Sequence, residues 1–173
     1  QLNGFKSFAE KTNFLIEKGL TGIVGPNGCG KSNIVESLRW CMGETSAKSM
    51  RGSGMEDVIF SGTSNKPSKN IAEVVLSLNN ESKDGPHQYN DLEEIEIKRK
   101  IEKDKGSKFY INNKEVRAKD AQMFFADLST GAHSPSLISQ GRIGALVTAK
   151  PSDRRAILEE AAGIAGLHVR RHE

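Results

Sequence analysis

Residues 25–32 read GPNGCGKS, which matches the phosphate-binding pattern G-x-x-x-x-G-K-[ST] at every fixed position. The five residues before this loop, LTGIV at 20–24, form a short apolar run that is typical of a buried strand. After the loop, apolar residues recur at helical spacing over residues 33–42. The order of strand, glycine-rich loop and helix predicts a P-loop, and with it an α/β nucleotide-binding fold.

The residue types of this loop suit a triphosphate. Gly25, Gly28 and Gly30 lack Cβ atoms, so the backbone can curl with positive φ and bring its N–H groups against phosphate oxygens. We expect the Lys31 ammonium to lie between the β- and γ-phosphates and the Ser32 hydroxyl to be a ligand of Mg²⁺. The predicted nucleotide-binding set in this stretch is Gly25, Pro26, Asn27, Gly28, Cys29, Gly30, Lys31, Ser32 and Asn33.

Composition bounds the class of protein. The 173 residues are enough for one domain with a real core, and the net charge of +3 permits contact with nucleic acid without requiring it. Cys29 lies in the P-loop, and Cys41 lies near the end of the predicted helix that follows the loop. A disulfide between them would strain the loop, so we expect a reducing cytoplasm. No apolar run approaches the roughly 20 residues of a membrane span. The chain starts in a strand-like pattern and stops in a helical one, so we expect a piece of a longer protein.

The remaining strand patterns predict an antiparallel portion. Apolar residues alternate with polar ones in several short segments, as expected for strands with one buried face. Strands at 1–8 and 13–17 would form an opening hairpin, and strands at 108–111 and 114–116 would form a second one with its turn at Asn112-Asn113. Single strands are predicted at 72–79, 94–101 and 136–139.

Three helices are expected. The helix over 33–42 should end at Gly43, with Trp40 at the edge of the core because it lies off the apolar stripe. A short helix over 120–128 should be capped by Asp120 and pack through its phenylalanines. A last helix should start near residue 151 and run to the terminus. The predicted stripe of the first helix is Ile34, Val35, Leu38, Cys41 and Met42, and the packing residues of the second are Phe124 and Phe125.

Longer strings narrow the class. They are GFKSF at 4–8, GPNGCGKSN at 25–33, SMRGSGMEDVIFSG at 49–62, ISQGRI at 138–143 and RRAILEEAAGI at 154–164. In this order they resemble the N-terminal half of the ATPase head of an SMC protein, closest to the bacterial chromosome-partition type. The resemblance implies a P-loop NTPase fold: an ABC-type head lobe with a mixed central sheet and an antiparallel β portion. Residues 1–173 would form this lobe, with 152–173 leading into a coiled coil.

The resemblance also assigns residues outside the P-loop. Gln140 matches the Q-loop glutamine, which implies a second Mg²⁺ ligand and a contact to the attacking water. Arg51 matches an arginine that reaches the nucleotide phosphates, and Gly52 and Gly54 around it would let its loop move. Lys6 and Ser7 resemble residues near the nucleotide in related heads. The alternative for Arg51, Lys6 and Ser7 is that they are solvated surface residues.

The resemblance implies an ATPase with ATP and Mg²⁺ as cofactors, but only half of its site. A signature motif, a Walker B Asp–Glu pair and a switch histidine should follow Gln140, and the similar strings at 123–127 and 128–132 come too early. This chain alone is therefore expected to be inactive. The implied partners are the C-terminal half of the same head, a second head, DNA and kleisin-type accessory subunits, and the implied role is chromosome condensation and segregation.

Two other functions stay open from the residues. One is a small P-loop kinase acting on a metabolite, and the other is a scaffold that binds ATP without turning it over. A basic run over residues 98–108 could contact DNA, but acidic residues interrupt it and no aromatic residues suited to stacking interleave with it. We interpret that run as the solvated face of a strand.

Overall fold

The computed structural model describes residues 1–81, 83, 86–128, 137–138, 148–152 and 154–155. Its central feature is a sheet of five strands in the order β1-β2-β3-β4-β5, every neighbouring pair antiparallel. The elements in chain order are β1 (Leu2–Asn3), α1 (Lys31–Cys41), the 3-10 helix η1 (Met55–Val58), β2 (Ile71–Asn79), the 3-10 helix η2 (His87–Tyr89), β3 (Glu94–Glu102), β4 (Gly106–Ile111), β5 (Lys114–Val116) and α2 (Ala118–Asp127).

Alternation of apolar and polar residues builds the sheet, as predicted. The long strands β2 and β3 pair from Ile71 opposite Glu102 to Asn79 opposite Glu94. The turn between β4 and β5 has positive φ at both Asn112 (48°) and Asn113 (65°), which is the geometry of a tight hairpin turn. The predicted strands at 72–79, 94–101, 108–111 and 114–116 are therefore confirmed.

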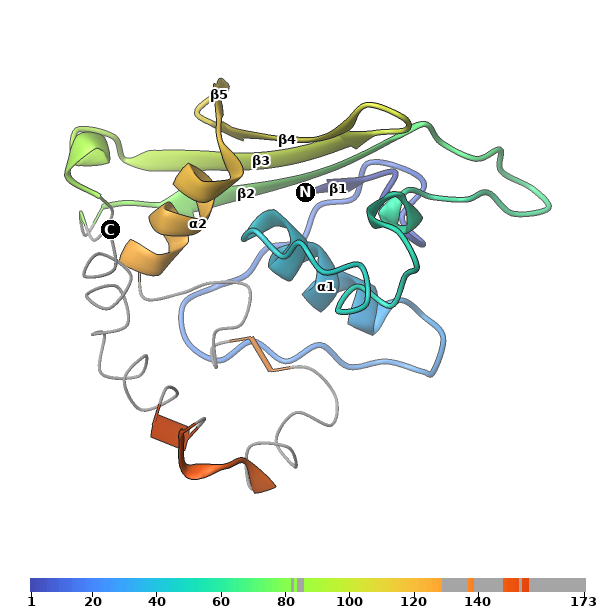
Figure 1. Ribbon diagram of the computed structural model, residues 1–173, viewed down its shortest axis with the longest axis horizontal. Coiled ribbons are helices and arrows are strands. Elements are labelled where there is room, and N and C mark those ends of the chain that lie inside the picture. Colours follow the sequence, from blue (N-terminus) through green and yellow to red (C-terminus); the bar gives the residue numbers. More distant parts are fainter. Residues whose placement is uncertain (82, 84–85, 129–136, 139–147, 153, 156–173) are drawn as a thin grey trace.

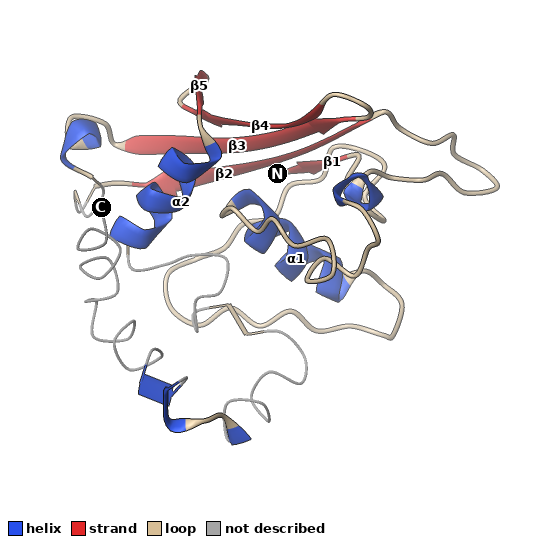
Figure 2. Cartoon of the chain, viewed as in Figure 1, coloured by secondary structure: helices blue, strands red, loops and turns tan. Residues whose placement is uncertain are grey.

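Both helices lie against the same face of the sheet (Figure 1; Figure 2). α1 and α2 are joined in one core cluster with the strands, which includes Trp40 and Cys41 from α1, Phe124 and Phe125 from α2, and Val74, Ile95, Ile97 and Ile101 from β2 and β3. The packing predicted for the two phenylalanines is confirmed, since both are buried. Gly43 follows Met42, the C-cap of α1, with a φ of 104°, and is thus the C′ residue that the sequence predicts.

Trp40 corrects the prediction of an edge position, because its side chain is fully buried. Its ring packs 5.4 Å from the ring of Phe5, centroid to centroid. The face of α1 that carries Trp40 and Cys41 points to the sheet. Ile34, Val35 and Leu38 of the predicted stripe are only half-buried and line a hollow away from the sheet. α1 thus has two apolar sides: Cys41 and Met42 of the predicted stripe reach the core, whereas its other three members line the hollow.

The strand predicted for the apolar run at 20–24 is not present, because this run forms no strand. It is extended and unpaired among the described residues, with Leu20 100% and Val24 92% exposed. A strand needs a neighbour for its N–H and C=O groups, and no described strand lies beside this segment. The described sheet is therefore antiparallel throughout, without the parallel part that a mixed sheet would have.

The opening hairpin is only partly formed. Leu2 bridges Thr12 as expected, but β1 pairs mainly with β2, and residues 13–17 are not a strand. Phe14, Leu15 and Ile16 are among the residues that line the same hollow as Ile34, Val35 and Leu38 of α1.

The N-cap of α2 lies three residues before the predicted one: it is Arg117 and not Asp120. The Asp120 carboxylate accepts a hydrogen bond from the Arg117 N–H at 3.1 Å.

The interpretation of the basic run 98–108 as a solvated face is wrong for one residue. Arg99 is buried, and its guanidinium lies between the rings of Trp40 and Phe109, 4.5 and 4.6 Å from their centroids. Its Nη1 donates to the carbonyl oxygens of Trp40 at 2.7 Å and Glu44 at 2.6 Å. Burial lowers the pKa of Arg99 to about 10. Lys103, Lys105 and Lys108 are exposed, so the solvated interpretation describes them and not Arg99.

Candidate nucleotide-binding site

The P-loop leads directly into the N-terminus of α1. The helix starts at Lys31, and its N-cap is Gly30, whose φ of 92° is left-handed and which offers no side chain to cap the first N–H groups. Gly28 also has a positive φ, 79°. Uncapped N–H groups at a helix start, together with the helix dipole, form a ready site for an anion. The structure therefore has a helix start without a side-chain cap at the position where the sequence predicts phosphate binding.

Gly25 differs from the expectation of a positive φ. A Cβ atom at this position would lie 3.0 Å from the Sγ of the exposed Cys29, so a larger residue would need the Cys29 side chain to shift. At Gly30 a positive φ and a close contact coincide, because a Cβ atom would also come within 3.0 Å of the Ser7 Oγ. The contact brings Ser7, predicted to lie near the nucleotide, to the rim of the P-loop.

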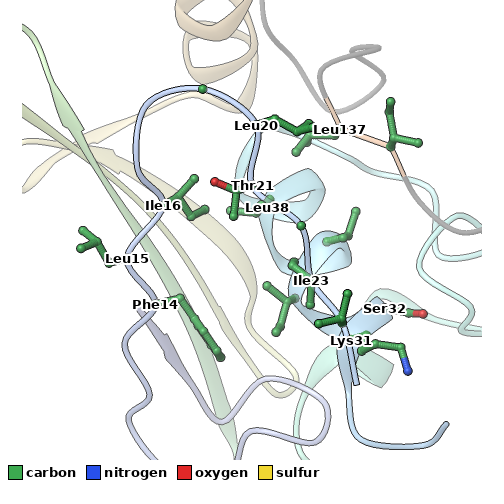
Figure 3. A pocket seen from close by; sticks show the side chains of 16 residues that line it. Phe14, Leu15, Ile16, Leu20, Thr21, Ile23, Lys31, Ser32, Leu38 and Leu137 are labelled. Carbon is green, nitrogen blue, oxygen red and sulfur yellow. The ribbon is translucent and has the colours of Figure 1, made fainter. Parts of the chain in front are cut away.

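The charged side chain of the P-loop turns back across the loop. The Lys31 Nζ donates to the carbonyl oxygens of Gly25 at 2.6 Å and Pro26 at 2.5 Å. Ser32 is the second residue of α1, and Figure 3 shows the two side chains at the same end of that helix. An ammonium and the N–H groups of the helix start meet here and are donors suited to phosphate oxygens, while the Ser32 hydroxyl oxygen is a ligand type suited to a hard cation.

A polar network continues from Asn33. Its Nδ2 donates to the Ser7 Oγ at 2.9 Å, and its Oδ1 accepts a bond from the Arg51 Nη2 at 2.8 Å. Lys6 and Arg51 both form ion pairs with Glu36 on α1. The structure thus brings Lys6, Ser7, Asn33 and Arg51 together from three segments of the chain.

Glu36 was missed by the sequence analysis. It is buried although it carries a charge, and it lies within the apolar pattern of the P-loop helix. Buried carboxylates need cationic partners, so an acidic residue inside an apolar helix pattern, one turn after Asn33, was the available signal. Gln140, in contrast, lies outside the described residues, as does most of the segment predicted to lead into a coiled coil.

The loop that carries Arg51 is held by its own hydrogen bonds. The Asp57 carboxylate accepts bonds from the N–H of Ser53 at 2.6 Å and of Gly54 at 2.9 Å, and from the Ser53 hydroxyl at 2.9 Å. These bonds, that from Gly54 foremost, lower the pKa of Asp57 below its usual value. Gly52 fits closely here, since a Cβ would come within 2.9 Å of the Asp57 Cβ. Gly52 therefore serves the close packing of this loop, whereas the sequence analysis assigned it to the movement of the loop.

An apolar hollow of about 730 Å³ lies beside the P-loop, on the side of α1 away from the sheet (Figure 3). The extended segment 14–24 runs along α1 there, and Lys31 and Ser32 lie at one end. Its apolar lining is Phe14, Leu15, Ile16, Leu20, Ile23, Val24, Ile34, Val35, Leu38, Leu137 and Ile138. Such a surface suits contact with protein better than with a charged nucleotide.

The cysteines are both free, Cys29 exposed and Cys41 buried, and burial raises the pKa of the Cys41 thiol to about 12. Within the described part of the chain, no helix is both long and apolar enough to cross a membrane.

Comparison with known proteins defines the class. The family model of the RecF/RecN/SMC N terminal domain matches residues 1–141, and the chain belongs to this family. Over its full length it is 58% identical to the chromosome partition protein Smc of Rhodopseudomonas palustris and 59% identical to that of Cereibacter sphaeroides. In each case it spans 15% of the length of the relative.

Solved structures agree with the family. A structure of the SmcHead bound to the C-winged helix domain of ScpA has a TM-score of 0.85 at 33% identity, over 95% of this chain and 50% of that one. Another, described under ATP-driven dimerization and DNA stimulated activation of SMC ATPases, has a TM-score of 0.78 at 31% identity, over 92% of this chain and 95% of that one. The fold is therefore that of the N-terminal part of an SMC ATPase head, a P-loop NTPase fold, as the sequence predicted.

Proposed function

We propose that this chain is the ATP-binding half of an SMC head. With its C-terminal half and a second head, it would bind and hydrolyse ATP to drive head engagement in chromosome condensation and segregation. The observation that carries the proposal is the uncapped start of α1 with Lys31 folded over the P-loop and Arg51 beside it. The names of the relatives support it, since they are chromosome partition proteins and SMC ATPases. Neither a metabolite kinase nor a non-hydrolysing scaffold is favoured by these relatives.

The described residues fit a bound triphosphate. N–H groups of the first turn of α1 would bind phosphate oxygens, and the Lys31 ammonium would leave the carbonyls of Gly25 and Pro26 for the β- and γ-phosphates. Ser32, and Gln140 outside the described residues, would be ligands of Mg²⁺, which neutralises charge on the phosphates when bound. Asn33, Arg51, Lys6 and Ser7 would complete the rim of the site.

The apolar hollow supports the need for a C-terminal half. Leu20 and Val24 are almost wholly exposed, although they belong to the run that leads into the P-loop. Strands from the other half would pair with this run and cover α1 on its second apolar side. Kleisin-type subunits and DNA are proposed as further partners, because a related head was solved with ScpA and another study names DNA-stimulated activation. A cytoplasmic, nucleoid-associated location follows from the same role.

Hydrolysis would depend on residues that this chain lacks. A general base and a signature motif are expected to come from the C-terminal half and the opposing head, so this chain supplies ground-state binding of ATP and no turnover.

Calorimetry of ATP binding to this chain tests the proposal, with Lys31→Ala as the variant and Lys18→Ala, an exposed lysine before the P-loop, as the control. Weak binding that Lys31→Ala abolishes and Lys18→Ala preserves is expected. Equal binding by all three proteins would contradict the proposed site.

A further inference from the structure

One carboxylate at the rim of the P-loop binds two cations. Glu36 of α1 forms an ion pair with the Lys6 Nζ at 2.5 Å and another with the Arg51 Nε, and its own side chain is only 9% exposed. Lys6 comes from the segment after β1 and Arg51 from the loop after α1. Three segments that are distant in the sequence therefore meet at a single side chain.

The contacts of Arg51 anchor one side of its guanidinium. Besides the Nε contact to Glu36, its Nη2 donates to the Asn33 Oδ1 at 2.8 Å. Asn33 and Glu36 are three residues apart on α1, so their side chains lie on one face of the helix. These two contacts use two of the five N–H donors of the group, and the Arg51 side chain is 58% exposed. The remaining donors can bond a ligand outside the protein.

Lys6 extends the same arrangement to the backbone of the loop. Its Nζ donates to the Met50 carbonyl oxygen, and its own N–H donates to the Val58 carbonyl oxygen at 2.7 Å. The two bonds fasten the loop just before Arg51 and at its far end. Glu36 thus acts on Arg51 twice, directly through the ion pair and indirectly through Lys6.

The charge of Glu36 decides where the two cations lie. The carboxylate is nearly dry, so its attraction to Lys6 and Arg51 is screened less than that of a surface pair. A neutral residue of the same size would leave two cations side by side, and the exposed Arg51 head group is the one free to move into solvent. The fold would change little, because Trp40 and Cys41 make the contact of α1 with the core.

We propose that Glu36 is a positioning residue that sets Arg51 for contact with the nucleotide phosphates. The inference rests on the proposed function, in which Arg51 is the phosphate contact. Glu36 itself touches no phosphate in this account. Its loss should lower turnover through a misplaced Arg51, while binding through Lys31 and the start of α1 continues.

The test uses the full-length protein and steady-state ATP hydrolysis. The variants are Glu36→Gln, Arg51→Ala and the two combined, with Glu10→Gln as the matched control because it breaks an exposed 2.6 Å ion pair to Lys66. We expect Glu36→Gln to lower kcat roughly tenfold with KM within about twofold, as for a displaced catalytic contact. The double variant should be no slower than Arg51→Ala alone, and Glu10→Gln should match the parent.

Losses that multiply in the double variant, or an unchanged kcat in Glu36→Gln beside a slow Arg51→Ala, would overturn the positioning role. An unchanged kcat in Arg51→Ala alone would overturn it through the proposed function, which is a separate and recognisable failure. If Glu36→Gln unfolds at a lower temperature than the control, Glu36→Asp restores the charge. Recovery of kcat without recovery of Tm supports positioning, whereas recovery of both together shows a merely structural role.

Discussion

At the scale of single residues, polar groups at the P-loop are held by one another. Lys31 bonds to carbonyl oxygens of its own loop, and Asn33 links Ser7 to Arg51. These contacts preorganise donors that a phosphate can take over, because charge-assisted bonds to an anion are stronger than bonds to neutral carbonyls. We therefore expect a phosphate that binds at the proposed site to exchange these partners with little rearrangement of the backbone.

Lys31→Ala should remove most ATP affinity while leaving Tm within about 2 °C of the parent, because Lys31 lies at the start of α1 and outside the hydrophobic core. Paired calorimetry and thermal unfolding measure the two quantities. A large fall in Tm would mean that Lys31 supports the fold, and the loss of binding would then say nothing about phosphate contact.

Arg99→Met should destabilise the chain by about 2 kcal/mol, since the carbonyl oxygens of Trp40 and Glu44 would lose a buried donor. Urea unfolding measures the loss. Lys100→Met is the matched control, because Lys100 follows in β3 on the other face of the sheet, and it should change stability by less than about 0.5 kcal/mol. Equal effects of the two variants would contradict the buried role of Arg99.

At the scale of elements, local pattern predicted what local forces decide. β2, β3, the hairpin of β4 and β5, and α1 follow from alternation, from the Asn112-Asn113 turn and from helical spacing. Two of the failures depend on a neighbour that is distant in the sequence. Trp40 is central because the sheet covers its side of α1, and the run at 20–24 forms no strand because no described strand lies beside it. Arg99 shares the alternation of Ile97 and Ile101, so its place on the core face was predictable.

The loop of Arg51 should depend on pH through Asp57. Because folding lowers the pKa of Asp57, its contribution to stability is complete above the ordinary aspartate pKa of about 3.9 and is lost as pH falls through the lowered value. Asp57→Asn should speed amide exchange at Ser53 and Gly54 at neutral pH, and the difference from the parent should shrink below about pH 4. Asp91→Asn, in another exposed loop, is the control. Equal exchange in Asp57→Asn and the parent at neutral pH would contradict this account.

At the scale of the whole molecule, the chain has a complete core on one side of α1 and an open apolar side on the other. The core between the sheet and the helices is closed around Trp40, whereas the hollow of about 730 Å³ is bordered by exposed Leu20 and Val24. The family-level fold and the P-loop were predictable from motifs. Which residues form the open side was not predictable, because no local pattern marks the apolar residues that stay uncovered.

Leu20→Asp should weaken association with a separately produced C-terminal half by more than tenfold, since burying a leucine contributes about 2 kcal/mol. The variant should keep the Tm of the isolated chain, because Leu20 is fully exposed there. Leu92→Asp, at an exposed position outside the hollow, is the control for both readouts. Unchanged association of Leu20→Asp, measured by calorimetry, would contradict the proposed docking side.

The most direct test of the split active site is ATP turnover by the isolated 173-residue chain, alone and mixed with its C-terminal half. The account predicts no steady turnover by the chain alone, and slow turnover that rises with protein concentration once the other half is added, because engagement of two heads completes the site. Steady turnover by the isolated chain that Lys31→Ala abolishes would contradict it, and would show a self-sufficient P-loop enzyme.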